Sequence, residues 1–216
     1  MQYSGNKIRQ VNPREPEPTF IRAAGQVIAT GGIVAFPTRN LYGLGADAFD
    51  CEAVEKIFTI KQRPSQMPLL ILIKHRNELH RVVRKVPPVA EYLMDCFWPG
   101  GLTIIFEAKP ELPLSLTAKS GKIGVRQPEH PVAAALVKAV LNPITGTSAN
   151  ISGEAGCSSV SLLAPAIRDS VDMILDAGPL PPGIGSSVID VTVEPFRILR
   201  EGSVSAQHLY KALNDH

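Results

Sequence analysis

The sequence has few cysteines, little excess charge and no long hydrophobic run. Its three cysteines, Cys51, Cys96 and Cys157, are widely spaced and lack a close histidine pair, so they indicate reduced thiols rather than disulfides or a zinc site. A net charge of +2 is too small to argue by itself for binding to nucleic acid or membranes. No apolar run could span a bilayer and the N-terminus lacks a secretory stretch, so we expect a cytoplasmic protein.

Two signatures of catalysis are also missing. No Gly-x-x-x-x-Gly-Lys segment is present, which excludes a P-loop enzyme of the Walker type. The five histidines have no metal-ligand spacing, and none pairs with a serine or cysteine nucleophile, which disfavours a hydrolase triad. We therefore expect no metal held by protein ligands alone.

The amino-acid composition is that of an ordinary globular protein. Of its 216 residues, 44% are hydrophobic and 19% are charged, which suffices for one domain with a sizeable core. Residues 11–18 are rich in proline and charge and predict an extended lead-in. We therefore expect a lead-in over residues 1–18 and a single domain over residues 19–216.

Short apolar runs alternate with amphipathic stripes along the chain. A helical stripe follows a potential cap at Thr19 and ends at Gly31-Gly32, and Asp50 can cap a second helix that reaches Lys61. Strands are expected at 33–36, 69–73, 102–106, 123–125, 173–175, 187–191 and 196–199. Further helices are expected at 89–97, at 131–140 and from 205. This alternation predicts an α/β fold: a three-layer arrangement with a twisted mixed sheet and helices on both faces.

Polar clusters follow several of the predicted strands. They occupy residues 37–45, 125–128, 147–153 and 198–202. Polar groups at strand ends usually gather around one crevice, so these loops are where we expect the chemistry. A fifth cluster, from Lys61 through Arg63 to Pro64, ends the second helix. It is either a solvated helix end or a phosphate clamp.

Most of these side chains allow a structural and a functional interpretation. Ser148 and Asn150 could satisfy turn backbone or could cradle phosphate and ribose oxygens. Arg126, which should emerge from a strand end, and Arg200 could form ion pairs, or could grip a carboxylate and a phosphate respectively. Asp190 could bind a magnesium ion indirectly, although a brace for its own turn is the favoured interpretation.

Taken in order, the clusters resemble the YrdC family. The matching segments run from about Gly31 to Ser203 and are Pro-Thr-x-x-x-Tyr-Gly-Leu-Gly, Lys-x-Arg-Pro, Trp-Pro-Gly with a following Thr, Val-Arg-x-Pro, Ser-Ala-Asn-x-Ser-Gly and Ile-Leu-Arg-x-Gly. The resemblance implies a twisted mixed sheet with a basic cleft. It also implies a nucleotidyltransferase that joins L-threonine, bicarbonate and ATP into threonylcarbamoyl-AMP and pyrophosphate for tRNA modification. We expect no room for the extra C-terminal domain of longer members.

Matched positions imply roles for eight side chains. The residues implied to hold threonine are Thr38, Arg126 and Ser186. The residues implied to hold ATP are Lys61, Arg63, Ser148, Asn150 and Arg200. Lys61 and Arg63 are the implied catalytic pair, sharing the charge of pyrophosphate with magnesium. Implied partners are RNA in the basic cleft and proteins that use the adenylate intermediate.

Four positions depart from the family pattern. Arg39 and Asn40 replace the usual acidic residue and threonine, Leu72 stands where many members carry histidine, and Gly185 replaces a frequent glutamate. Arg39 reverses a charge near the substrate, which leaves the amino-acid specificity open. Two alternatives therefore remain. One is a YciO-like paralogue of uncertain activity, with which Arg39 and the Asn12-Pro13 lead-in are compatible, and the other is an RNA-binding module without catalysis.

Overall fold

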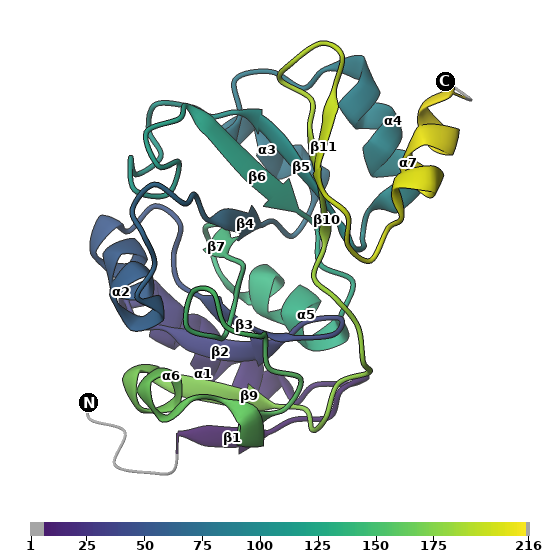
Figure 1. Ribbon diagram of the computed structural model, residues 1–216. Coiled ribbons are helices and arrows are strands. Elements are labelled where there is room, and N and C mark those ends of the chain that lie inside the picture. Colours follow the sequence, from purple (N-terminus) through teal and green to yellow (C-terminus); the bar gives the residue numbers. More distant parts are fainter. Residues whose placement is uncertain (1–6, 215–216) are drawn as a thin grey trace.

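The computed structural model describes residues 7–214, whose strands form two mixed sheets, one above the other in Figure 1. Sheet A, the lower one, has the order β1-β9-β2-β3-β8, in which β1, β9 and β2 are parallel. Its strands are β1 (Ile8–Gln10), β9 (Met173–Asp176), β2 (Val34–Pro37), β3 (Tyr42–Gly45) and β8 (Thr147–Ser148). Part of the expected lead-in is therefore a strand of this sheet. Residues 1–6 and 215–216, where the expected lead-in starts and the expected domain ends, lie outside the described part.

Sheet B lies above sheet A and has the order β11-β10-β5-β6-β4-β7. Its strands are β11 (Arg197–Arg200), β10 (Ser187–Asp190), β5 (Leu102–Glu107), β6 (Lys122–Arg126), β4 (Leu70–Leu72) and β7 (Ile144–Thr145). The pairs β10–β5 and β4–β6 are parallel, whereas β5–β6, β10–β11 and β4–β7 are antiparallel. The expected mixture of parallel and antiparallel pairing is thus confirmed.

The chain passes from one sheet to the other at Gly146. This residue separates β7, which pairs with β4 of sheet B, from β8, which pairs with β3 of sheet A. A Cβ at position 146 would lie 2.7 Å from both Leu70 Cδ1 and Leu72 Cγ, so the close passage requires glycine. The Thr145 N–H donates to Ala46 O (2.9 Å) and joins the sheets. The strands expected in one sheet are therefore divided between two joined sheets.

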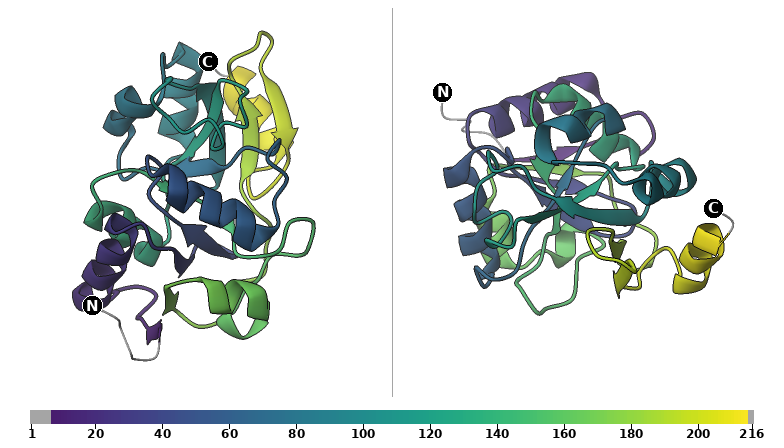
Figure 2. Two further views of the ribbon diagram at one scale, coloured as in Figure 1. Left: turned by 90° about the vertical axis from the view of Figure 1, so that its left-hand side faces the viewer. Right: turned by 90° about the horizontal axis from the view of Figure 1, so that it is seen from above.

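Helices cover both sheets, which confirms the predicted α/β class with helices on both faces. The helices are α1 (Pro18–Ala29), α2 (Cys51–Lys61), α3 (Leu79–Val82), α4 (Pro88–Phe97), α5 (Pro131–Ala139), α6 (Pro165–Ser170) and α7 (Ala206–Asn214), with short turns η1 (Arg76–Glu78) and η2 (Val160–Leu162). Helices α1 and α5 pack together on sheet A, and α2 packs with α6. Helix α7 contacts α4 and stands to one side of sheet B in the view from above in Figure 2.

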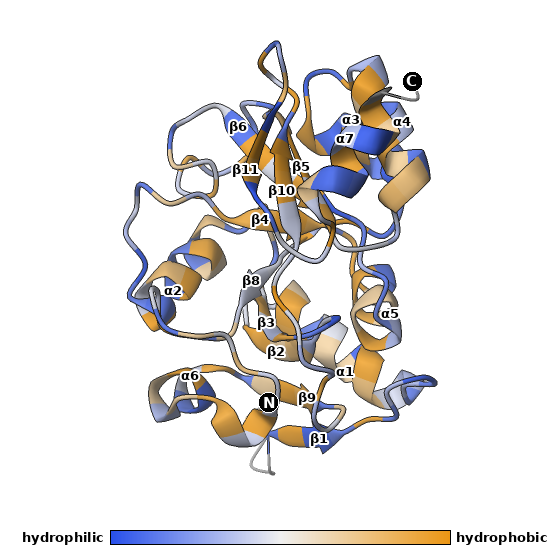
Figure 3. Cartoon of the chain, turned by 45° about the vertical axis from the view of Figure 1, so that its right-hand side comes forward, coloured by the Kyte–Doolittle hydropathy of each residue, from blue (hydrophilic) through white to orange (hydrophobic). Residues whose placement is uncertain are grey.

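Sheet A separates two apolar clusters. Val34 and Phe36 of β2 face the cluster that contains α1 and α5, whereas Ala35 between them faces the larger cluster shared with sheet B. This follows from the two-residue period of a strand. Figure 3 accordingly shows the central strands mostly in hydrophobic colours. Among the described residues, no helix is both long and apolar enough to cross a membrane.

Several local predictions are confirmed and others are corrected. Asp50 caps α2 as predicted, because its Oδ1 accepts from the N–H groups of Glu52 (2.9 Å) and Ala53 (3.1 Å). Helix α1 begins one residue before the expected cap Thr19, at Pro18, whose fixed φ suits a first helical position. Strand β3 occupies residues expected to form a loop, and β7, β8 and α6 were not predicted.

Candidate functional site

A cavity of about 480 Å³ lies where the two sheets meet. Its walls come from the turn between β2 and β3, from β8, from the segment that precedes β10, and from one face of sheet B. Its lining includes five cationic residues, namely Arg39, Arg63, Lys122, Arg126 and Arg200. Asp190 is the one acidic lining residue within the described part of the chain. The excess of positive charge makes the cavity a site for anions.

The floor of the cavity is formed by alternate residues of three neighbouring strands. Lys122, Gly124 and Arg126 of β6 share one face because strand side chains alternate with a period of two. Thr103 of β5 and Val188 of β10 continue this face. The side chains of Lys122 and Arg126 are therefore about 13 Å apart along β6, with only glycine between them.

Arg126 brings a buried positive charge to the cavity. It ends β6, as the sequence predicts for its position at a strand end, and its residue is only 9% exposed. Within the described residues, its buried Nε has no hydrogen-bond partner. Burial lowers the pKa of Arg126 to about 10, while the charge of Glu129 raises that pKa and the charge of Arg200 lowers it further. The guanidinium remains charged at neutral pH and can accept an anionic ligand.

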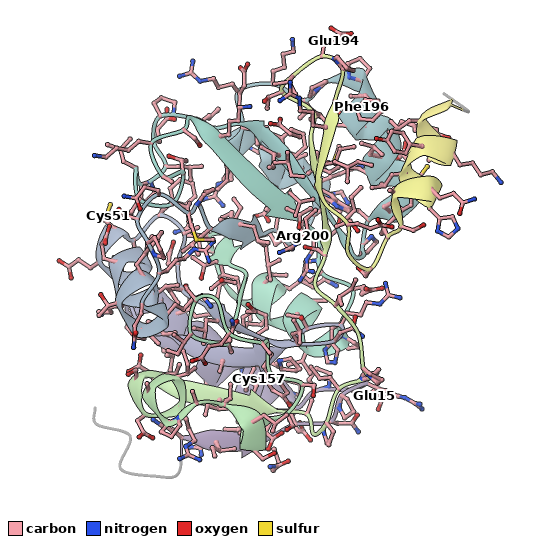
Figure 4. The ribbon with its side chains drawn as sticks, viewed as in Figure 1. Glu15, Cys51, Cys157, Glu194, Phe196 and Arg200 are labelled. Atoms are coloured by element: carbon pink, nitrogen blue, oxygen red, sulfur yellow. The ribbon has the colours of Figure 1, made fainter. Side chains whose placement is uncertain are left out.

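Arg200 donates two hydrogen bonds to Ser186. The Arg200 Nε donates to Ser186 O (2.9 Å), and its Nη2 donates to Ser186 Oγ (3.2 Å). A further hydrogen bond joins Ser186 Oγ to Thr103 Oγ1 (2.8 Å). In Figure 4, Arg200 lies near the level where the two sheets meet. The family resemblance implied that Ser186 holds threonine and Arg200 holds ATP, and the structure brings these two side chains into direct contact.

Lys61 is a buried residue rather than a solvated helix end. It is 1% exposed, and its Nζ donates to Asn150 O (2.7 Å) and to Ser148 O. Burial lowers the pKa of Lys61 to about 8, and the nearby charge of Arg63 lowers it in the same direction. Lys61 does not line the cavity within the described part of the chain. Its observed contacts hold the backbone of the loop that follows β8.

Asn150 shapes the same loop. Its Nδ2 donates to Ile151 O (2.9 Å) and to Glu154 O (2.7 Å), and its Oδ1 accepts from Ser148 Oγ. Of this pair only Ser148 lines the cavity. The structural interpretation, turn bracing, therefore describes the contacts of Asn150, while Ser148 is placed to meet a ligand.

Arg63 lies between α2 and the cavity. Gln62 adopts the left-handed conformation (φ 48°) that ends α2, and Arg63 follows it into the cavity wall. The Arg63 guanidinium donates to Met67 O (3.0 Å) and Pro68 O (2.9 Å), which fixes the loop beyond the helix. Burial lowers the pKa of Arg63, and the charge of Arg200 adds to this effect. Arg63 and Arg200 therefore line the same cavity, and the positive charge of one affects the other.

The turn between β2 and β3 carries Thr38, Arg39 and Asn40 to the cavity. Thr38 Oγ1 donates to Leu41 O (2.6 Å), which closes the turn. Arg39 Nη1 lies 3.4 Å from Glu129 Oε1, and Asn40 Nδ2 donates to backbone carbonyls of the segment before β10. Two of the four residues that depart from the family pattern, Arg39 and Asn40, therefore connect this turn to other parts of the chain.

Asp190 braces its turn, as the sequence analysis favoured. Its Oδ1 accepts from the N–H (2.8 Å) and the Oγ1 (2.6 Å) of Thr192, and its Oδ2 pairs with Lys122 Nζ (2.9 Å). Residues 7–214 contain no group of three or more His, Cys, Asp or Glu side chains that could hold a metal. The residues present therefore do not fit a magnesium ion held by the protein alone.

Sequence reasoning missed two residues of this region and assigned no role to a third. Lys122 shares the cavity face of β6 with Arg126, and Glu129 pairs with Arg39. The two-residue spacing from Lys122 through Gly124 to Arg126 could have identified Lys122, whereas the contact of Glu129 joins segments far apart in the sequence. Thr103 is the threonine of the Trp-Pro-Gly segment, and the structure shows that it supports Ser186.

Comparison with known proteins gives concordant matches. The Sua5/YciO/YrdC family model, described as "Telomere recombination", matches residues 26–202. A Pyrococcus abyssi protein named threonylcarbamoyl-AMP synthase is 36% identical over 206 residues, which are 95% of this chain and 61% of the relative. This chain therefore spans less than two thirds of that relative's length.

Solved structures agree with this result. The crystal structure of P. abyssi Sua5 complexed with L-threonine has a TM-score of 0.92 and 36% identity, covering 96% of this chain and 61% of that one. The crystal structure of Escherichia coli YciO has a TM-score of 0.80 and 30% identity, covering 92% of this chain and 97% of that one. Family model, relative and structures together show that the chain belongs to the Sua5/YciO/YrdC family.

Proposed function

We propose that this protein is a cytoplasmic L-threonylcarbamoyladenylate synthase that consumes L-threonine, bicarbonate and ATP and releases pyrophosphate. The observation that carries the proposal is Arg126, a buried cation whose Nε has no hydrogen-bond partner among residues 7–214, in a cavity whose described lining includes four other cations. A buried cationic group that is not fully hydrogen-bonded is costly, so the site suits an anion. The P. abyssi relative named as this enzyme, and the Sua5 structure complexed with L-threonine, indicate which anion.

The threonine half of the site consists of Arg126, Ser186 and Thr38. The planar fork of Arg126 matches a carboxylate, which it can hold with two parallel hydrogen bonds. Ser186 Oγ lies between Thr103 and Arg200 and lines the cavity, so its hydroxyl can meet a polar group of the amino acid. Thr38 borders the same cavity from the opposite sheet.

The ATP half consists of Arg63, Arg200 and Ser148, supported from behind by Lys61 and Asn150. Arg63 and Arg200 supply the charge that a triphosphate requires. Lys61 acts in this proposal through the loop that it holds at the carbonyls of Ser148 and Asn150. Magnesium would arrive bound to the phosphates of ATP, because the protein offers no carboxylate cluster of its own within the described residues.

The chemistry needs positioned cations more than a base. The amine of threonine and bicarbonate give the N-carboxylate with loss of water. An oxygen of this N-carboxylate then attacks the α-phosphorus of ATP. The bond between the α-phosphorus and the oxygen that bridges it to the β-phosphorus breaks, and pyrophosphate leaves. Because the nucleophile is already an anion, the main tasks are bringing the anions together and stabilising the leaving charge. Arg63 and Arg200 can do both.

The test is release of pyrophosphate from ATP with bicarbonate and each amino acid in turn. We expect release that requires both bicarbonate and L-threonine, together with an adenylate whose mass matches threonylcarbamoyl-AMP. The matched control is the Arg126→Gln variant, which keeps a polar side chain but loses the positive charge and the two-pronged donor fork. Release that does not depend on an amino acid would contradict the proposal.

A YciO-like activity is the second candidate. The chain covers 97% of E. coli YciO, and Arg39 reverses a charge that the synthase pattern places beside the substrate. This candidate predicts stabilisation by ATP without threonine-dependent pyrophosphate release.

The five cations of the cavity also permit RNA binding, which should then weaken steeply with salt. Proteins that transfer the threonylcarbamoyl group to tRNA are the expected users of the product.

A further inference from the structure

An ion pair joins Arg39, a residue of the cavity lining, to Glu129, which is not among the described residues that line the cavity. Arg39 comes from the turn of sheet A, and Glu129 comes from the segment that follows β6 of sheet B. Their charged groups are 3.4 Å apart, and the side chains are 51% and 38% exposed. Arg39 lines the cavity itself. The pair therefore links the turn between β2 and β3 to the segment that follows β6, at a position accessible to solvent.

Glu129 is the fixed anion closest in sequence to Arg126. It follows Arg126 by three residues, and although burial lowers the pKa of the Arg126 guanidinium, the charge of Glu129 opposes part of that effect. A carboxylate in this position has two consequences for an incoming anion. It repels the anion, and it competes with the anion for the same arginine.

We propose that Arg39 is a positioning residue that pairs with Glu129 and so leaves Arg126 free for the carboxylate of the substrate. Arg39 acts in this scheme through Glu129 and not by contact with the ligand. The inference rests on the proposed function to the extent that the ligand is L-threonine. The electrostatic relation itself applies to any carboxylate held by Arg126.

A double-mutant cycle tests this relation. The four proteins are the wild type, Arg39→Gln, Glu129→Gln and the double variant, and the measurements are KM and kcat for L-threonine together with calorimetric binding of L-threonine without ATP. We expect Arg39→Gln to raise KM about threefold to fivefold with kcat unchanged, the size of effect given by a solvent-exposed ion pair. In the Glu129→Gln background, Arg39→Gln should have no effect, because the charge that it neutralises is gone.

Two further variants complete the design. Arg39→Lys keeps the positive charge and should restore most of the affinity. Arg76→Gln removes a comparably exposed arginine that pairs with Asp95 outside the cavity, and it should leave KM unchanged. An equal rise in KM from Arg39→Gln in both backgrounds would show direct contact with the substrate and would overturn the proposal, as would an unchanged KM in Arg39→Gln.

Failure of the proposed function would have a different appearance. In that case the wild type itself would show no threonine-dependent release of pyrophosphate. The cycle is then measured with acetate as the probe, using NMR titration at constant ionic strength. If Arg39→Gln weakens acetate binding in the wild-type background but not in the Glu129→Gln background, the inference is still supported. Identical acetate binding by all four proteins would refute it.

Discussion

Replacing Lys61 by methionine should destabilise the protein although the residue ends a helix. Methionine keeps the length of the side chain but leaves the carbonyls of Ser148 and Asn150 without their buried donor. An unsatisfied buried acceptor costs about 1–3 kcal/mol, so the two together should cost about 2–4 kcal/mol once the apolar gain is subtracted. For a protein of this length, such a loss lowers the melting temperature by about 5–15 °C.

The same variant gives a pH dependence with a defined sign. The pKa of Lys61 is about 8 in the folded protein, against 10.5 ordinarily, so between these pH values the unfolded chain binds more protons. Wild-type stability should therefore rise with pH across this window, by about 3 kcal/mol in total, and this contribution is lost as the pH falls through 8. The Lys61→Met variant should lack this rise.

Urea unfolding at pH 7, 8, 9 and 10 measures both effects. The matched control is Lys56→Met on the same helix, because Lys56 also donates to a backbone carbonyl, Gly31 O, but is exposed. We expect this control to change stability by less than about 0.5 kcal/mol. The reasoning would be refuted if Lys61→Met were as stable as Lys56→Met, or if its deficit shrank with rising pH.

Three other perturbations have defined outcomes. Arg126→Lys should raise the KM for threonine by about one to two orders of magnitude in steady-state assays, because lysine loses the two-pronged grip on a carboxylate. Impaired ATP binding with normal threonine affinity would instead place Arg126 among the phosphate contacts. Magnesium-ATP at 100 times its Kd should stabilise the protein by about 2.7 kcal/mol, seen as a rise in melting temperature by scanning fluorimetry; no rise at millimolar ATP would contradict nucleotide binding. Gly146→Ala should cost about 1–3 kcal/mol in urea unfolding, because its Cβ would meet Leu70 and Leu72, and an unchanged midpoint would contradict this.

Local signals were sufficient for much of the fold. The cap at Asp50 and the end of β6 at Arg126 depend on residues within a few positions, and both were predicted. Strand β3 was missed because its Tyr-Gly-Leu-Gly segment reads as turn chemistry, although all four residues are buried. The two-residue strands β7 and β8 are too short to leave a periodic signal.

Other features depend on contacts that no local pattern encodes. The burial of Lys61 follows from a loop 87 residues further along the chain, so a helix end that looks solvated is enclosed by the fold. The chain passes between the two sheets at Gly146, whose close approach to Leu70 and Leu72 of β4 is also a long-range contact. The Arg39–Glu129 pair likewise joins the turn between β2 and β3 to the segment that follows β6. Residue types at the site were therefore predictable, but the partner of each side chain was not.

The cavity lining contains several positive charges whose burial is unfavourable. Burial lowers the pKa of each of Arg63, Arg126 and Arg200, which means that the fold holds these charges at a cost. Asp190, which among residues 7–214 is the one acidic residue of the lining, already binds Lys122 and Thr192, so it does not compensate the charges of the arginines. An anionic ligand would remove most of this cost when it binds. The unfavourable free energy of these buried charges is thus offset when carboxylate and phosphate groups are held close together, which is what the proposed reaction requires.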